Sequence, residues 1–158
     1  MKEKIDTLDI RDEYELDENG NPNADSTDGS EYEVVGESFV KDNIKSVFVG
    51  AVKKFGENNS IAEIDVILIP EVGNPYDKKS VRVDALLSIK DKEVNSIPIG
   101  HLPRESARGF RKAFPNKALI AKGYIDAGYW LDDNEKDFSV TIQVPLTVLD
   151  KYDWQPEG

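Results

Sequence analysis

The strongest constraint on the fold is a regular alternation near the C-terminal end of the chain. Apolar side chains occupy every second position from Phe138 to Val148, and mostly polar side chains separate them. Successive side chains of a β-strand point to opposite faces, so this pattern predicts a long strand with one buried face. Antiparallel sheets commonly bury one face and leave the other to water, so we expect a sheet of that kind.

The remaining elements are predicted from shorter patterns. Val81 to Ile89 alternates in the same way, and other segments are rich in Ile and Val. Ser38 is a possible helix cap, and Pro103 suits the first turn of a second helix. The expected strands are 32–36, 62–69, 81–89, 97–102, 118–130 and 138–148, and the expected helices are 39–48 and 103–114. This order predicts an α+β fold with about two helices and a mainly antiparallel sheet.

The net charge of −11 is distributed unevenly along the chain. Residues 1–33 hold 12 acidic and 3 basic residues, which leaves residues 34–158 with 19 acidic and 17 basic ones. We therefore expect three parts: a mostly disordered acidic tail over 1–31, with a short helix over 5–14, a folded domain over 32–150, and a polar end over 151–158. The tail is expected either to solubilise the protein or to fold back over a basic site as a charge mimic of DNA.

Composition excludes several classes of protein. The chain has no cysteine and one histidine, His101, so we expect no disulfide, no zinc site and no cofactor. No apolar run approaches the roughly 18 residues of a membrane span, and no apolar segment follows Met1 to form a signal peptide. We expect a cytoplasmic protein.

Enzymatic motifs are missing from the sequence. The glycine-rich phosphate loops and the Gly-x-Ser-x-Gly pattern do not occur, and His101 has no evident Ser/Asp partner. Scattered carboxylates such as Glu63, Asp65 and Glu71, with Lys79 nearby, could bind Mg²⁺ as in nucleases, but the first two more simply mark the solvent face of a strand. We expect no catalytic activity and no metal.

A polar turn and a basic helix are the candidate functional features. Asn74-Pro75-Tyr76-Asp77 is typical of a turn, because Asn-Pro initiates turns and Asp accepts hydrogen bonds from nearby amides. In the second helix Arg104, Arg108 and Arg111 are spaced as one stripe, opposite the apolar side chains. Such a stripe is either an ordinary solvated face or a phosphate-binding face, since the guanidinium fork matches phosphate oxygens.

Five short motifs define a longer pattern: Val34-Val35-Gly36-Glu37-Ser38, Pro70-Glu71, Asn74-Pro75-Tyr76-Asp77, Val81-Arg82-Val83 and Ile99-Gly100-His101-Leu102-Pro103-Arg104-Glu105. In this spacing, residues 34–149 resemble the HIRAN domain, a small module found alone in bacteria and fused to fork-remodelling DNA-dependent ATPases in eukaryotes. The resemblance implies a small, OB-like β-barrel. It also implies a module that binds the ends of nucleic acids.

The resemblance also implies roles for individual residues. Tyr76 and Asp77 match the pocket for the last nucleotide of a DNA 3′ end, where an uncharged hydroxyl can donate to a carboxylate. His101 and Arg104 match positions that contact backbone phosphates, and Arg108 and Arg111 would extend that track. His101 can equally be a hydrogen-bonded structural histidine at a strand end. Phe39 matches an aromatic residue that stacks on a base.

The chain departs from the family pattern at one position beside Phe39. Ser38 stands where the DNA-binding eukaryotic members have a basic residue, and the Gly-Glu-Ser-aromatic run resembles the bacterial stand-alone form. An aromatic residue on a helix is more often part of the core, so Phe39 can also be structural. Phe138 is a second candidate for base stacking.

The expected function is therefore a non-catalytic module that binds single-stranded or frayed DNA, at 3′ ends, in DNA repair or replication. A helicase or a nuclease is an expected partner protein. The alternative is a protein-interaction module of the same fold that does not bind DNA. Ser38, the acidic tail and the slightly negative body favour this alternative.

Overall fold

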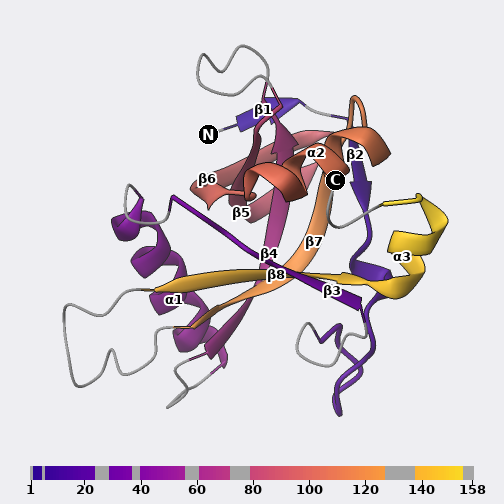
Figure 1. Cartoon of the computed structure of the whole chain (residues 1–158). Coiled ribbons are helices and arrows are strands. Elements are labelled where there is room, and N and C mark those ends of the chain that lie inside the picture. The colour runs from indigo at the N-terminus through magenta and orange to yellow at the C-terminus, as the bar shows by residue number, and fades with distance from the viewer. Residues whose placement is uncertain are drawn as a thin grey trace.

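The fold is seen in a computed structural model, which describes residues 2–4, 6–23, 29–36, 40–55, 61–71, 79–126 and 138–154. In these ranges eight strands form one sheet and three α-helices flank it (Figure 1). The strands are β1 (Lys2–Lys4), β2 (Thr7–Asp9), β3 (Gly29–Glu33), β4 (Ile61–Pro70), β5 (Val81–Lys90), β6 (Glu93–His101), β7 (Ala118–Asp126) and β8 (Ser139–Pro145). The helices are α1 (Lys41–Phe55), α2 (Arg104–Ala113) and α3 (Leu146–Lys151).

The sheet is antiparallel throughout, except where β2 pairs in parallel with β7. Its strand order is β1-β6-β5-β4-β7-β8-β3, with β2 off this path. The predicted α+β class with a mainly antiparallel sheet is confirmed. The ladders leave the sheet open, and one isolated bridge joins Val35, just after β3, to His101 at the end of β6.

Gly100 allows this bridge to form. Val35 and His101 exchange two backbone hydrogen bonds of 2.8 and 2.9 Å. Gly100 has φ of +144°, and a Cβ there would stand 2.6 Å from the Val35 carbonyl oxygen and closer still to Val34 Cγ1. Only glycine combines this backbone conformation with so close an approach. The Val-Val pair and the Ile-Gly-His run of the sequence are thus neighbours in space.

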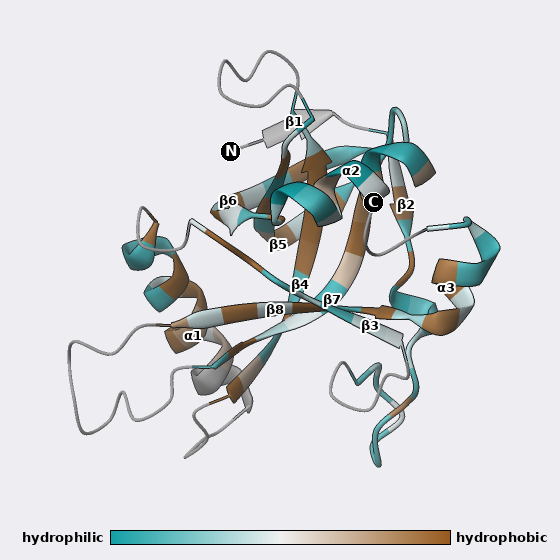
Figure 2. Ribbon diagram, viewed as in Figure 1, coloured by the Kyte–Doolittle hydropathy of each residue, from teal (hydrophilic) through white to brown (hydrophobic). Residues whose placement is uncertain are grey.

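The main core lies between the strands and the helices, and it includes the chain beyond β8. Figure 2 shows that β4 is largely hydrophobic and that hydrophobic and more polar residues alternate along β8, whereas α2 is mostly hydrophilic. Trp154 is 1% exposed and stacks on Tyr32, with ring centroids 5.3 Å apart, and it also packs edge-on against Phe110 and Phe114. Trp154 thus lies in the core, within the segment that the sequence predicts as a polar end.

A second, smaller apolar cluster lies on the opposite face of the same strands. Ile67 and Ile69 alternate along β4 with the core residues Val66 and Leu68, and they pack with Val94, Ala118 and Ile120. The N-terminal strands flank this cluster, because β1 pairs with β6 and β2 pairs with β7. These strands contribute ladder hydrogen bonds to the sheet around it.

Residues 1–31 were expected to form a mostly disordered tail, and the described residues of that segment include two strands and buried side chains. Instead of a helix over residues 5–14, the chain forms β1, β2 and a 3₁₀ turn at Arg11–Glu13. Ile10 and Tyr14 are buried in the main core. These two apolar side chains tie an otherwise acidic segment to the core.

Two strand predictions are corrected by local irregularities. Bulges in the β5–β6 ladder shift the alternation, so that Asp84 is buried and Leu87 is 53% exposed. The last strand ends at Pro145, and α3 begins at Leu146, where a strand to Val148 was expected. The expected helix over residues 39–48 corresponds to α1, which begins at Lys41 and is longer, and the expected second helix corresponds to α2.

Candidate nucleic-acid interface

Three strand ends and one helix meet at a single edge of the fold. The end of β4, the start of β5 and the end of β6 are adjacent, because Pro70 pairs with Val81 and Arg82 pairs with His101. The chain leaves β6 at His101 and enters α2 at Arg104, after two intervening residues, and the Leu102 amide donates to the Val81 carbonyl. This edge therefore gathers three of the five motifs that the sequence singled out.

Glu71 is the hub of the hydrogen bonds at this edge. Its Oε1 atom lies 2.8 Å from His101 Nε2 and accepts a 2.8 Å hydrogen bond from the Ser80 hydroxyl. Its backbone amide donates to the Ser80 carbonyl at 3.0 Å. The Glu71 carboxylate, just after the end of β4, thus orients the His101 side chain, which is 42% exposed.

Arg111 is bound to backbone carbonyls at the same place. Its Nη1 atom donates to the carbonyl oxygens of Glu71 and Ser80, both at 3.0 Å. Glu71 and Ser80 precede and follow the connection between β4 and β5. Arg111 therefore binds the backbone at this edge, whereas the sequence predicts that it contacts phosphate.

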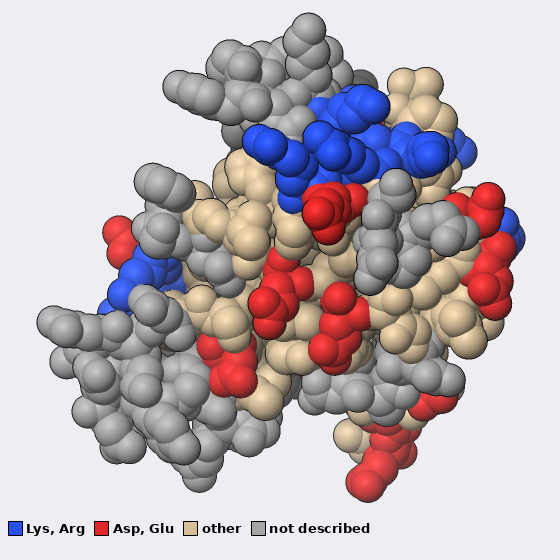
Figure 3. All heavy atoms as spheres, viewed as in Figure 1, with Lys and Arg blue, Asp and Glu red and all other residues tan. Residues whose placement is uncertain are grey.

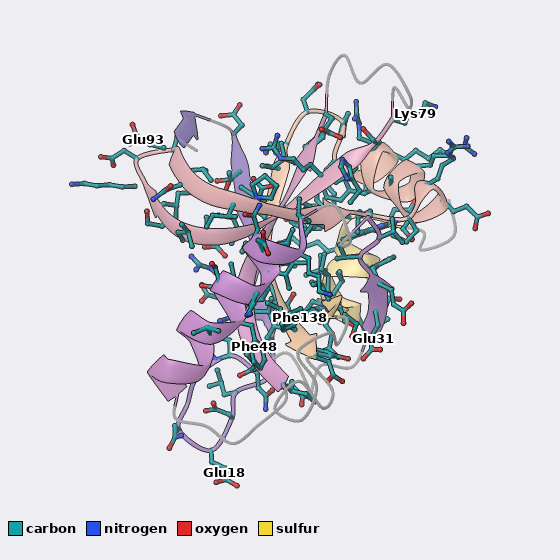
Figure 4. All side chains as sticks on the ribbon, turned by 90° about the vertical axis from the view of Figure 1, so that its left-hand side faces the viewer. Glu18, Glu31, Phe48, Lys79, Glu93 and Phe138 are labelled. Atoms are coloured by element: carbon teal, nitrogen blue, oxygen red, sulfur yellow. The ribbon has the colours of Figure 1, made fainter. Side chains whose placement is uncertain are left out.

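The outer face of α2 is basic, and its inner face is apolar. Ala107 and Phe110 are buried against the core, whereas Arg104, Arg108 and Lys112 are exposed. Figure 3 shows Lys and Arg side chains gathered over α2, with acidic side chains below them. Lys79 is labelled next to α2 in Figure 4, and it adjoins Ser80, which Arg111 contacts. Positive charge is thus concentrated locally on a chain whose net charge is negative.

Arg82 lies beside His101 but is held by an acid. Its Nε atom donates to Oδ1 of the buried Asp84 at 2.8 Å, and the Ser96 hydroxyl donates to the same carboxylate. A buried carboxylate needs such partners to remain charged at low cost. Arg82 is therefore used to neutralise Asp84.

The carboxylates that were considered for a metal site have other partners. Asp65 pairs with Arg11 at 2.9 Å and with Lys122 at 2.7 Å, whereas Glu71 pairs with His101. Burial disfavours the charged form of Asp9, but hydrogen bonds from Arg11 and its charge prevail and lower the pKa of Asp9 below its ordinary value. Within the described ranges no group of three or more His, Asp and Glu side chains is arranged to hold a metal ion.

The structure brings together four of the predicted site residues: His101, Arg104, Arg108 and Arg111. Tyr76, Asp77 and Phe39 lie outside the described residues. Phe138 is buried against Phe48, with ring centroids 5.7 Å apart, and so it is not an exposed stacking surface (Figure 4).

Sequence reasoning missed the role of Glu71 and Ser80 as the two bound ends of the β4–β5 connection. The available signal was their position on either side of the Asn-Pro-Tyr-Asp motif. Their shared partner, Arg111, lies 40 positions after Glu71 and 31 positions after Ser80, so no local sequence pattern indicates the contact.

The chain was compared with protein-family models, curated proteins and solved structures, and no match was found. The resemblance to the HIRAN domain rests on the motifs of the sequence. Among the helices of the described ranges, none combines the length and the hydropathy needed to cross a membrane.

Proposed function

We propose that the chain is a HIRAN-type domain that binds single-stranded or frayed DNA at 3′ ends and performs no chemistry of its own. One observation carries the proposal: the exposed basic face of α2 stands at the same edge of the sheet as His101 and both ends of the 72–79 connection. That connection contains Tyr76 and Asp77, which the resemblance assigns to the end pocket.

The charges at this edge suit a single strand of phosphates. Arg104, Arg108 and Lys112 are spaced along one exposed helical face, and His101 follows the adjacent strand end. Arginine and lysine side chains of this kind bind phosphate oxygens by charge and hydrogen bonds. His101 and Arg104 would hold the phosphates nearest the 3′ end, and Arg108 and Lys112 would hold those further away.

A barrel is part of this proposal. The bridge between Val35 and His101 links β3, which ends the sheet path, to β6, which lies next to β1 at the other end of the path, and this supports closure around the main core. Closure would remove exposed edges, as small β-barrels do. The same bridge joins Val35 to His101, so the first and last motifs of the resemblance would form one surface.

The hydrogen bonds at the edge also support a binding role over a hydrolytic one. The Ser80 hydroxyl and His101 both bond to the Glu71 carboxylate. A serine nucleophile requires its hydroxyl to bond to the histidine that accepts its proton. The function we infer is accordingly recognition, in a DNA repair or replication setting with a helicase or nuclease partner.

The alternative is a protein-interaction module of the same fold without DNA binding. The observation that favours it is the acidic β3, where Glu31 and Glu33 are exposed and are followed by Val35, which is 45% exposed. Acidic and apolar side chains side by side are more typical of a protein surface than of a phosphate-binding one.

Fluorescence anisotropy with a labelled single strand distinguishes the two functions. We expect the full chain to bind, with a log–log salt slope near −2, because the three Arg and Lys contacts on α2 contribute roughly 0.7 each. Arg104→Gln with Arg108→Gln should flatten the slope to about −0.7. The matched control is Lys45→Gln with Lys90→Gln, which removes the same charge from exposed positions elsewhere and should leave the slope unchanged.

The 3′ end is tested with strands that differ only in their last group. A 3′-phosphate should bind about tenfold to a hundredfold more weakly than a 3′-hydroxyl, because a hydrogen bond to a charged acceptor contributes roughly 1.5–3 kcal/mol. Asp77→Asn should narrow this difference. Absence of binding by the wild-type chain would favour the protein-interaction alternative, and equal binding of both strands would remove the end pocket but leave the basic face.

A further inference from the structure

The backbone of β3 is hydrogen-bonded on one side only. β3 ends the strand order of the sheet, and its one partner strand in the described ranges is β8. The Val34 amide donates to the Val140 carbonyl, so the backbone groups of Tyr32, two residues earlier, also point toward β8. Those of Glu31 and Glu33 therefore point to the other side, where no described residue pairs with them.

Pro103 explains why β6 does not continue along this side of β3. Val35 and His101 exchange two backbone hydrogen bonds in an antiparallel bridge. In the same register Glu33 would lie opposite Pro103, which has no amide hydrogen to donate, and α2 begins at the next residue. The bridge is therefore a single pair, and β6 turns away before it reaches the outward backbone groups of Glu33 and Glu31.

The side chains along this edge are acidic. Tyr32 and Val34 are buried in the core. The alternation of a strand puts Glu31 and Glu33 on the outer face, where both are exposed. The Glu31 carboxylate accepts a 2.7 Å hydrogen bond from Gln143, whereas the Glu33 carboxylate has no hydrogen bond to any described residue. Figure 3 shows acidic side chains on the surface below α2.

We propose that this edge of β3 binds an extended protein segment that has Lys or Arg at every second position and adds to the sheet as a further strand. Its residues opposite Glu33 and Glu31 would each exchange two backbone hydrogen bonds with β3, as His101 does with Val35. Directly opposed side chains lie on the same face, so two basic residues would meet the two carboxylates. A second copy of β3 would instead place like charges together, which is unfavourable. Such binding does not require the basic face of α2.

Amide hydrogen exchange of the full chain, followed by NMR, tests the added strand with the synthetic peptide Thr-Val-Lys-Val-Lys-Val-Thr. At saturating peptide the amides of Glu31 and Glu33 should exchange at least about tenfold more slowly. The Val34 amide is already bonded to Val140 and should be unchanged. Methylation of the two lysine amide nitrogens of the peptide should abolish binding, because these nitrogens donate to β3. Methylation of the valine nitrogen between them should leave binding intact.

Glu33→Lys tests the charge of the partner, and Glu18→Lys is the matched control, because it makes the same change at another exposed acid. In fluorescence anisotropy with the labelled peptide, Glu33→Lys should weaken binding by about fivefold or more, since an attractive cross-strand pair becomes a repulsive one. Glu18→Lys should bind as the wild type does. A peptide with Glu in place of both lysines should bind Glu33→Lys better than it binds the wild type.

Several results would overturn this proposal. The added strand is excluded if the amides of Glu31 and Glu33 exchange at the same rate with and without the lysine peptide. A basic partner is excluded if the lysine and glutamate peptides bind the wild type equally. Slower exchange of these two amides at higher protein concentration alone would identify a second copy as the occupant, and slower exchange with a single-stranded oligonucleotide would identify nucleic acid. The salt slope of DNA binding is a separate measurement, so either proposal can fail while the other stands.

Discussion

Replacing Tyr14 with phenylalanine tests whether the N-terminal segment belongs to the fold. Tyr14 is 4% exposed, and its hydroxyl donates to the Gln143 carbonyl and accepts a 2.9 Å hydrogen bond from the Lys122 amide. It therefore links the segment to β7 and β8. Burial raises the pKa of Tyr14 far above its ordinary value, so the hydroxyl stays protonated and can donate at any ordinary pH.

The expected loss of stability follows from the groups left behind. Tyr14→Phe retains the ring but leaves the Lys122 amide and the Gln143 carbonyl each without the hydroxyl, which costs about 1–3 kcal/mol. Tyr14→Ala also leaves a cavity and should cost about 3–5 kcal/mol, as for other large aromatic truncations. In a domain of this size each kcal/mol lowers Tm by about 2–4 °C.

Urea denaturation followed by fluorescence provides the assay, with Tyr152→Phe as the matched control. Tyr152 packs against Phe114, and its hydroxyl has no hydrogen bond to any residue in the described ranges, so its loss should cost less than about 0.5 kcal/mol. If Tyr14→Phe unfolds at the same urea concentration as Tyr152→Phe and the wild type, residues 6–23 do not dock on β7 and β8, and the reasoning is refuted.

Two further predictions concern the bridge and the alkaline limit. Gly100→Ala should lower the free energy of unfolding in urea by about 2–5 kcal/mol, since the new Cβ meets Val34 and Val35 at a positive φ. The control Gly50→Ala, which has open space in α1, should be neutral or stabilising. Equal effects of the two substitutions would contradict the bridge. Burial raises the pKa of Tyr32 to about 12, so its contribution to stability is complete below the ordinary pKa of about 10 and is lost as pH rises through 12. Tyr32→Phe should reduce this loss of stability at alkaline pH. An unchanged dependence of stability on pH would contradict the role of Tyr32.

The parts of the fold that could be predicted are those in which the local pattern carries the information. The alternation after Phe138 predicted β8, and the apolar and basic faces around Phe110 predicted α2. The strand ends at Pro145, three residues before the predicted end at Val148, and α3 begins at the next residue. The alternation in β5 misplaced Leu87, since bulges depend on the partner strand and leave no mark in a single segment.

The N-terminal segment and the β4–β5 edge could not be predicted, for the same physical reason. Ile10 and Tyr14 are sparse anchors in an acidic segment, and the partners of Tyr14 lie more than a hundred positions away. The role of Arg111 likewise depends on carbonyls that only the strand pairing brings to it. Composition measures the average of a segment, whereas burial of one well-partnered side chain decides whether the segment is ordered.

The placement of the N-terminal acids changes how a tail that mimics DNA could be tested. Asp6 pairs with Lys92, and Asp9 pairs with Arg11, which in turn bonds to Asp65. These acids help to hold the segment that contributes β1 and β2 to the sheet, so deleting residues 1–31 would remove part of the fold together with the negative charge. A change in DNA binding after such a deletion could not be assigned to charge alone. Autoinhibition can be tested separately from folding only by substituting exposed acidic residues with neutral ones. Such substitutions keep Ile10, Tyr14 and the strands β1 and β2 in the chain.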